Sequence, residues 1–178
     1  MNWYQDEYPI QEKLDPTGYD WKDKNVIDLG CNVGMVCPYV LERGAKTYTG
    51  IELEGKYIRE AKRRFPKEIY LQMDVRLFML ERERKDNEVV LALGLFHHLT
   101  DDKVIDVVNN CAGDLIFEVP TGKDVSYGAY RVRDEEWYKE LVKNYKEVTI
   151  LNSGMPLMKG YPFGRKIFIC KGRQDVES

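Results

Sequence analysis

Several short runs of this sequence are almost continuously apolar, and two of them, Val89–Leu93 and Leu115–Phe117, contain no polar residue. Such runs are typical of strands that helices cover on both faces, as in a parallel sheet. Between the runs, apolar residues recur at helical spacing, as in Ile58, Ala61 and Phe65. The alternation of strand and helix through the first five runs predicts an α/β fold with right-handed crossovers.

The last two runs have no helical pattern between them, so they predict an antiparallel hairpin with a long loop from Asn152 to Gly164. The whole pattern predicts three layers: a seven-stranded, mostly parallel sheet with an antiparallel C-terminal hairpin strand, and helices on both faces. The predicted strands are Asn25–Leu29, Thr47–Glu52, Glu68–Met73, Glu88–Leu93, Asp114–Val119, Glu147–Leu151 and Arg165–Lys171.

The length of the chain sets its domain organisation. With 178 residues, of which 43% are hydrophobic, the sequence can bury one sizeable core but is short for two domains. We predict a single domain over residues 1–178, with a catalytic core at 23–172. Residues 1–22 include the aromatic stretch NWYQDEYPI, which either folds over the ligand as a lid or forms a helix packed on the sheet.

Charge and cysteine content exclude several functional classes. A net charge of −3 argues against nucleic-acid binding as the main activity. The cysteines, Cys31, Cys37, Cys111 and Cys170, form no CxxC pair and lie at no zinc-ligand spacing from the two histidines, so we predict no metal site.

The N-terminus lacks a secretion signal, and no apolar run approaches the roughly 18 residues of a membrane span. We expect a cytoplasmic protein without membrane contact, either a monomer or a homodimer.

The stretch VIDLGCNVGM, Val26 to Met35, predicts a ligand-binding turn. Its strand ends in Asp28 and Leu29, and Gly30 and Gly34 follow, with the next helix expected to begin near Val33. The spacing does not fit the dinucleotide fingerprint G-x-G-x-x-G, because Asn32 occupies the position of the middle glycine. Asparagine tolerates a left-handed backbone, but its side chain crowds a pyrophosphate and adds hydrogen-bonding groups. The turn therefore suits a ligand that has no phosphate.

This stretch resembles the first motif of the class I S-adenosylmethionine-dependent methyltransferases, an acid-x-Gly-x-Gly-x-Gly pattern on a Rossmann-like fold. The resemblance implies that Glu52, 18 residues beyond Gly34, holds both ribose hydroxyls, and that Asp74 contacts the adenine amino group. It also implies that VVLALGLFHHLTDD borders the methionine portion of the cofactor. The implied cofactor-binding residues are Asp28, Gly30, Asn32, Gly34, Glu52, Leu53, Asp74, Val75 and Gly94.

Several of these residues also fit purely structural roles. Asp28 could cap the following turn, and Gly34 could be a packing glycine. Glu54 is a rival to Glu52, although Glu52 lies nearer the predicted strand end. Asp74 could cap the next helix, which is compatible with an adenine contact. The basic run REAKRRF is more typical of a solvated helix face than of a nucleic-acid patch, because glutamates are interspersed.

The motif after the fourth strand narrows the chemistry. Amino-group methyltransferases that act on DNA bases usually carry an Asn/Asp-Pro-Pro-aromatic tetrapeptide here, whereas this chain has Gly94-Leu95-Phe96-His97. The stretch LGLFHHL resembles a motif of enzymes that act on small molecules and on some modified tRNA bases. The resemblance implies metal-independent, in-line methyl transfer to an O, N or C nucleophile of a small molecule. The alternatives are a tRNA or rRNA base methyltransferase and a non-catalytic S-adenosylmethionine-binding module.

His97 and His98 are the candidate catalytic residues, because a histidine can act as a general base near neutral pH. Adjacent side chains generally point apart, so we expect one of them at most to reach the methyl group. Further candidates for substrate contacts come from the N-terminal segment, the end of the fifth strand and the long polar loop predicted after it. They are Tyr4, Glu118, Tyr127, Tyr130 and Arg131.

Overall fold

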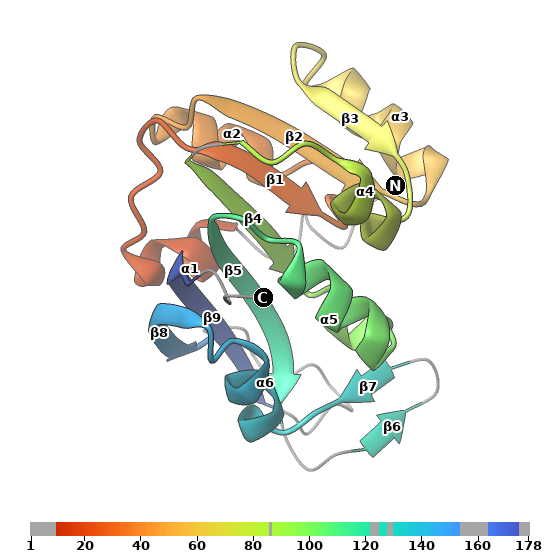
Figure 1. Ribbon diagram of the computed structural model, residues 1–178. Helices are drawn as coiled ribbons and strands as arrows, with labels where there is room; N and C mark the ends of the chain where they lie inside the picture. The colour runs from red at the N-terminus through yellow and green to blue at the C-terminus, as the bar shows by residue number, and fades with distance from the viewer. Residues whose placement is uncertain (1–9, 86, 122–124, 128–129, 154–163, 175–178) are drawn as a thin grey trace.

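The computed structural model describes residues 10–85, 87–121, 125–127, 130–153 and 164–174 (Figure 1). Within these residues, one seven-stranded sheet has the order β3-β2-β1-β4-β5-β9-β8, and a separate hairpin pairs β6 with β7. The strands are β1 (Asn25–Leu29), β2 (Thr47–Glu52), β3 (Ile69–Gln72), β4 (Glu88–Leu93), β5 (Asp114–Thr121), β6 (Val125–Tyr127), β7 (Tyr130–Val132), β8 (Tyr145–Asn152) and β9 (Gly164–Arg173). The helices are α1 (Ile10–Leu14), η2 (Asp15–Thr17), α2 (Val36–Glu42), α3 (Gly55–Arg64), α4 (Val75–Glu81), η3 (Phe96–His98), α5 (Asp101–Asn109) and α6 (Glu135–Leu141).

The sheet is parallel from β3 to β5 and antiparallel at its C-terminal side. β1 pairs in parallel with β2 and with β4, so that Asp28 lies opposite both Gly50 and Leu91. β9 runs antiparallel to β5 and to β8. Both the mostly parallel sheet and the antiparallel C-terminal hairpin strand were predicted correctly. The order of the strands reverses between β1 and β4, and ligands of such sheets bind at the carboxyl ends beside this reversal.

Helices cover both faces of the sheet, as Figure 1 shows. One hydrophobic core lies between the sheet and α4, α5 and α6, with Phe117 and Phe168 stacked at a centroid distance of 4.6 Å. The other core lies between the sheet and α1, α2 and α3, and it includes Trp21 and Tyr39. Because both faces are covered, the β4 run Val89–Ala92 is fully buried, which explains its continuous apolar character.

Two local predictions were wrong. The helix after β1 begins at Val36 and not near Val33, because Gly34 takes a φ of 78° and the chain still turns there. The segment after β5, predicted as a loop, contains the short strands β6 and β7. Strands of three residues are too short to produce an alternating pattern that could be recognised in a sequence. The loop predicted between Asn152 and Gly164 lies mostly outside the described residues.

The four cysteines all carry free, buried thiols. In the described part of the chain, no helix is long and apolar enough to cross a membrane.

Candidate functional site

The loop after β1 turns through three left-handed residues. Gly30, Asn32 and Gly34 have φ values of 71°, 50° and 78°, so Asn32 adopts the left-handed conformation that asparagine tolerates. The N–H of Gly30 donates to the carbonyl oxygen of Ile51 at 2.8 Å. A Cβ on Gly30 would lie 3.2 Å from Cδ1 of Leu95, which shows how closely this loop approaches the segment after β4. The positive φ favours glycine at position 30, and any side chain there would also have to displace Leu95.

Glu52, at the end of β2, holds this loop through its carboxylate. Oε2 accepts a hydrogen bond from the N–H of Asn32 at 3.1 Å, and Oε1 accepts one from the N–H of Glu54 at 3.0 Å. The neighbouring Leu53 is 60% exposed. Within the described residues, the buried side-chain oxygen of Asn32 accepts no hydrogen bond. The end of β2 and the loop after β1 thus bring together a carboxylate, an exposed apolar side chain and a buried oxygen that lacks a described partner.

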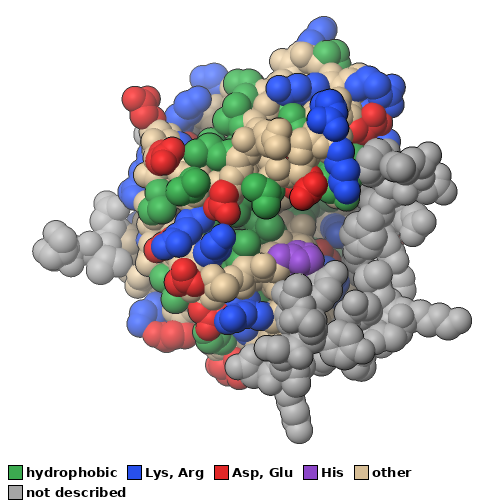
Figure 2. Space-filling model, turned by 90° about the vertical axis from the view of Figure 1, so that its right-hand side faces the viewer, with side chains coloured by type: hydrophobic (Ala, Val, Ile, Leu, Met, Phe, Trp, Pro, Cys, Tyr) green, Lys and Arg blue, Asp and Glu red, His purple; other side chains and the backbone are tan. Residues whose placement is uncertain are grey.

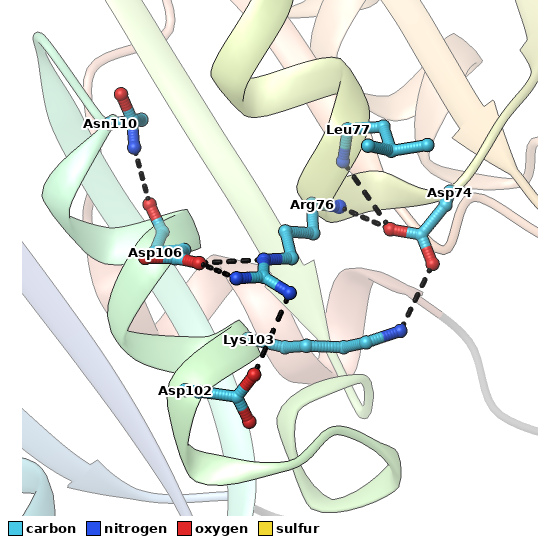
Figure 3. Close-up of polar contacts among 7 residues, drawn as sticks. All are labelled: Asp74, Arg76, Leu77, Asp102, Lys103, Asp106 and Asn110. Carbon is cyan, nitrogen blue, oxygen red and sulfur yellow. Dashed lines mark hydrogen bonds and ion pairs between the residues drawn. The ribbon is translucent and has the colours of Figure 1, made fainter.

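Asp74, after β3, caps α4, as the sequence predicted. Its Oδ1 accepts from the backbone N–H groups of Arg76 at 2.8 Å and Leu77 at 3.3 Å. Its Oδ2 accepts from Nζ of Lys103 on α5 at 3.2 Å (Figure 3). Burial acts to raise the pKa of Asp74, but the hydrogen bonds from Lys103 and from the backbone outweigh it and lower the pKa. The carboxylate is therefore held ionised and fixed in direction, next to the buried Val75.

Arg76, two residues after Asp74, also joins α4 to α5. Its guanidinium bonds Asp106 at 2.6 Å and lies 3.6 Å from Asp102, both of which are on α5. Figure 3 shows that these pairs and the Asp74–Lys103 pair join α4 to α5. The position of Asp74 is thus coupled to the packing of α4 on α5.

Asp28 lies below the loop rather than on its surface. It is 2% exposed, and the hydroxyl of Tyr48 donates to its Oδ2 at 2.6 Å. Burial raises the pKa of Asp28 to about 7; the Tyr48 hydrogen bond opposes this shift, and the charge of Glu52 adds to it. The carboxyl group can therefore change its charge near neutral pH.

The segment after β4 carries the two histidines. Gly94 has a φ of 69°, and its N–H donates to the carbonyl oxygen of Glu118 at 3.0 Å. His97 is 4% exposed, and burial together with the positive charges of His98, Arg165 and Arg133 lowers its pKa to about 3. His98 is exposed, and Figure 2 shows histidine surface on the face that lies at the right of Figure 1. Burial and the charge of Arg165 lower the pKa of His98 as well.

The two imidazole rings do not point apart. Their centroids are 4.2 Å from one another, so the expectation that adjacent side chains diverge was wrong here. The short helix η3 is the reason, because residues of a tight turn follow one another on the same side more closely than residues of a strand.

A comparison with protein families finds that the family model described as "Methyltransferase domain" matches residues 26–115. The chain belongs to the S-adenosylmethionine-dependent methyltransferases. The match begins in β1 and ends in β5, so it contains the glycine loop, Glu52, Asp74 and both histidines.

Solved structures similar to this methyltransferase share its fold over most of their length. The PH0226 protein from Pyrococcus horikoshii OT3 has a TM-score of 0.72 and 16% identity, covering 95% of this chain and 92% of that chain. A methyltransferase from Archaeoglobus fulgidus has a TM-score of 0.70 and 12% identity, covering 89% and 90%. Magnesium protoporphyrin IX methyltransferase from Synechocystis PCC 6803, with bound S-adenosylmethionine, has a TM-score of 0.65 and 15% identity, covering 94% and 77%. A comparison with curated proteins found no match.

The carboxyl ends of β1 and β2 fit the methyl donor of this family. Gly30 keeps the backbone of the loop free of a side chain, and within the described residues the buried oxygen of Asn32 accepts no hydrogen bond. An uncharged amide oxygen is a suitable acceptor for an ammonium or hydroxyl group of the donor. Among the described residues, no group of three or more His, Cys, Asp or Glu side chains is placed to hold a metal ion.

Arg133 is a residue of this methyltransferase that the sequence did not single out. Its guanidinium donates to the carbonyl oxygens of Phe96 at 3.1 Å and Leu99 at 2.9 Å, which flank the two histidines. It also bonds Asp101 at 2.6 Å and lies 4.6 Å from the ring centroid of Trp137. Arg133 thus fixes the turn that carries His97 and His98, although the sequence RVRD does not distinguish it from Arg131.

The predicted substrate residues have different outcomes. Glu118, predicted at the end of the fifth strand, lies within β5, which continues to Thr121. It is fully buried and bonds Lys13, Ser153 and Arg165. Arg131 is half-exposed, and its guanidinium lies 3.6 Å from the carboxylate of Asp101. Its described partner is thus not one of the residues that bond Glu118. Tyr4 and the side chains of Tyr127 and Tyr130 lie outside the described part of the chain.

Proposed function

We propose that this methyltransferase transfers the methyl group of S-adenosylmethionine to an O, N or C nucleophile of a small molecule, by in-line displacement and without a resident metal ion. The cofactor supplies an already activated methyl group on its sulfonium. The protein has to bind both reactants and align them, which can provide much of the rate enhancement. The main observation in support is the position of four features: the glycine loop, Glu52, Asp74 and the histidine turn. Each lies at the carboxyl end of one of the strands β1 to β4.

Glu52 and Asn32 would hold the ribose and methionine portions. Each oxygen of Glu52 accepts one backbone N–H, and a carboxylate oxygen can accept a further hydrogen bond from a ribose hydroxyl. The same contacts fix the direction in which the carboxylate points. Asp28, buried below the loop and bonded by the hydroxyl of Tyr48, would support the loop from beneath.

Asp74, Val75 and Leu53 would hold the adenine. Lys103 and the first turn of α4 already orient the Asp74 carboxylate, so it can accept a hydrogen bond from the adenine amino group with little loss of side-chain entropy. Leu53 exposes apolar surface beside Glu52, which suits the face of a purine. We therefore assign the nucleoside end of the cofactor to β2 and β3.

The acceptor would bind at the ends of β4 and β5. His98 is the better candidate for a proton acceptor, because its ring is exposed. His97 is buried, and its lowered pKa makes it a weak base. This arrangement favours a nucleophile that needs little help to lose its proton. The solved methyltransferase from Synechocystis, named for magnesium protoporphyrin IX, is an example of small-molecule methylation on this fold.

RNA is the less favoured acceptor. The basic helix α3 would have to face it, but Glu60 on that helix bonds both Arg63 and Arg64. These contacts neutralise part of the positive charge, as in a solvated helix face. The proposal includes a cytoplasmic location, which is supported by the four free thiols because reducing compartments maintain them.

The test is calorimetric titration with S-adenosylhomocysteine, followed by a screen for labelled methyl transfer to a metabolite library and to total RNA. Micromolar binding and transfer to a small acceptor would support the proposal. Gly30→Val is the control that should abolish binding, because its Cβ would meet Leu95 and its φ would be strained. Absence of binding in the wild type would refute the proposal. Binding without transfer would favour a non-catalytic module, and salt-sensitive transfer to RNA would favour the RNA alternative.

A further inference from the structure

A buried carboxylate at the acceptor end of the sheet joins three distant parts of the chain. Glu118 is 0% exposed and pairs in the sheet with Leu93, the last residue of β4. Its Oε2 accepts from Nζ of Lys13 on α1 at 3.1 Å, and its Oε1 accepts from the hydroxyl of Ser153 at 2.6 Å. NH1 of Arg165 on β9 lies 3.4 Å from Oε2. We call these four residues, Lys13, Glu118, Ser153 and Arg165, the Arg165 cluster.

The cluster carries more positive than negative charge. Of its members, Lys13 and Arg165 are cations, and Glu118 is the one carboxylate. The side chains of Lys13 and Arg165 are 11% and 17% exposed, so water reaches both cations only in part. A surplus charge with so little water is costly unless a counter-charge joins it. The cluster is therefore suited to an anion that arrives from outside.

The positive charge reaches the histidine turn. Arg165 is among the causes that lower the pKa of both His97 and His98, after burial in each case. A Cβ on Gly94 would lie 3.6 Å from NH1 of Arg165, 3.9 Å from Oε2 of Glu118 and 4.0 Å from Cε1 of His97. The guanidinium of Arg165, the carboxylate of Glu118 and the imidazole of His97 thus all lie close to Gly94, where we propose that the acceptor binds.

Arg165 has donors available for a ligand. Among the described residues, Glu118 is the one that accepts from its guanidinium, through NH1 and at a long distance. A guanidinium presents five N–H donors in a planar fork that matches a carboxylate or phosphate group. The remaining donors can therefore form the paired contacts that such an anion requires.

The position of the cluster favours the acceptor over the cofactor as the source of the anion. The order β3-β2-β1-β4-β5-β9 puts Glu118 on β5 three strand spacings from Glu52 on β2, which is about 14 Å. Glu118 is two spacings from the glycine loop after β1, on the far side of β4. Asn32, Glu52 and Asp74, which we proposed for the cofactor, lie on the other side of that strand.

We infer that the Arg165 cluster binds a carboxylate or phosphate group carried by the methyl acceptor. The inference rests on the proposed function and specifies its substrate class: an anionic small molecule, held by Arg165 and Lys13 beside the histidine turn. Glu118 takes no part in contacting the anion, but positions the two cations.

The two histidines are reporters for a direct test, because the chain contains no others. The protein, labelled with ¹³C-histidine, is titrated with inorganic phosphate and separately with acetate, with and without S-adenosylhomocysteine, and the ring signals are followed by NMR. We expect a saturable shift of the His98 signal and a rise in the pKa of His98, because a bound anion offsets the charge of Arg165.

Substitutions of Arg165 and of its neighbour Lys166 test where phosphate binds. Arg165→Gln should weaken phosphate binding about tenfold or more, the effect of losing a charged hydrogen bond. Lys166→Gln is the matched control: it removes one positive charge from the next position of β9, on the opposite face of the strand, and should bind phosphate as the wild type does. Arg165→Lys keeps the charge but not the fork, so its affinity should fall between those of the wild type and Arg165→Gln. It also serves as the test variant if Arg165→Gln does not fold, as judged by circular dichroism.

Three results would overturn the inference. The first is the lack of a saturable histidine shift in the wild type. The second is phosphate affinity in the Arg165 variants equal to that of the wild type. The third is competition between S-adenosylhomocysteine and phosphate together with loss of S-adenosylhomocysteine affinity in Arg165→Gln, which would assign the cluster to the carboxylate of the cofactor. Failure of S-adenosylhomocysteine to bind the wild type would instead refute the proposed function, and the phosphate titration without it would still report on the cluster.

Discussion

Replacing Asp28 by asparagine should stabilise the protein above neutral pH. Burial raises the pKa of this carboxyl group from 3.8 to about 7, although the hydrogen bond from Tyr48 opposes the shift. A group whose pKa is higher in the folded chain than in the unfolded chain contributes its full stability below the unfolded value. That contribution is lost between about pH 4 and pH 7, because the protein must then keep an ionised carboxylate buried.

The magnitude follows from the two pKa values. A difference of about 3 in pKa corresponds to about 4 kcal/mol of unfolding free energy. The window from pH 5 to pH 8 covers about 3 kcal/mol of this amount. Asparagine does not ionise, and its side-chain oxygen can still accept the hydrogen bond from Tyr48. The Asp28→Asn variant should therefore lack this part of the pH dependence.

The assay is urea unfolding of the wild type and of Asp28→Asn at four pH values from 5 to 8, without ligand. The free energy of the wild type should fall relative to that of the variant by about 3 kcal/mol across this range. Tyr48→Phe is a control of opposite sign: it removes the hydrogen bond that lowers the pKa of Asp28, so the loss of stability should extend to higher pH. Parallel curves for the wild type and Asp28→Asn would refute the reasoning.

Three further substitutions test the site. Glu52→Gln should weaken S-adenosylhomocysteine binding by about 1.5–3 kcal/mol in calorimetry, because a charged hydrogen-bond acceptor is lost; unchanged affinity would contradict the ribose assignment. Asn32→Gly should preserve both this affinity and the melting temperature, whereas Asn32→Val should cost roughly 1–2 kcal/mol of stability, because a β-branched residue disfavours a φ of 50°; equal behaviour of the two variants would rule out the role of backbone conformation. Arg133→Lys should cost roughly 1–3 kcal/mol in urea unfolding, since the carbonyl groups of Phe96 and Leu99 lose donors, and should shift the NMR signals of both histidines. Histidine signals like those of the wild type would show that Arg133 does not hold their turn.

Features that depend on local physics could be predicted from the sequence. β1, β2 and β4 begin and end at the predicted residues. For β4 the reason is that both faces are covered, so the run Val89–Leu93 is apolar throughout. The left-handed Asn32 followed from the few residue types that tolerate positive φ. Asp74 as the cap of α4 followed from its position before an apolar helical pattern.

Features that depend on contacts between distant residues could not be predicted. Lys13 and Glu118 are 105 positions apart, and Arg133 is 37 positions from Phe96. The chain contains 27 lysines and arginines, most of them in patterns that suit a solvated surface. Nothing in the sequence distinguishes the arginine that is buried against two carbonyl groups from its exposed neighbour Arg131, because burial is decided by the packing of β7 on η3.

The contacts between distant residues gather on the acceptor side of the proposed site. The residues assigned to the cofactor, from Asp28 to Gly94, all lie within the segment 26–115 that the family model matches. On the acceptor side, His97 and His98 also lie within this segment, whereas Lys13, Glu118, Arg133 and Arg165 lie outside it. Enzymes that share a cofactor but differ in acceptor need the same contacts at β1 to β3 and different ones beyond β4, because the cofactor imposes one geometry and each acceptor another. The acceptor is therefore best sought through the charges on α1 and β9, which resemblance to a family does not describe.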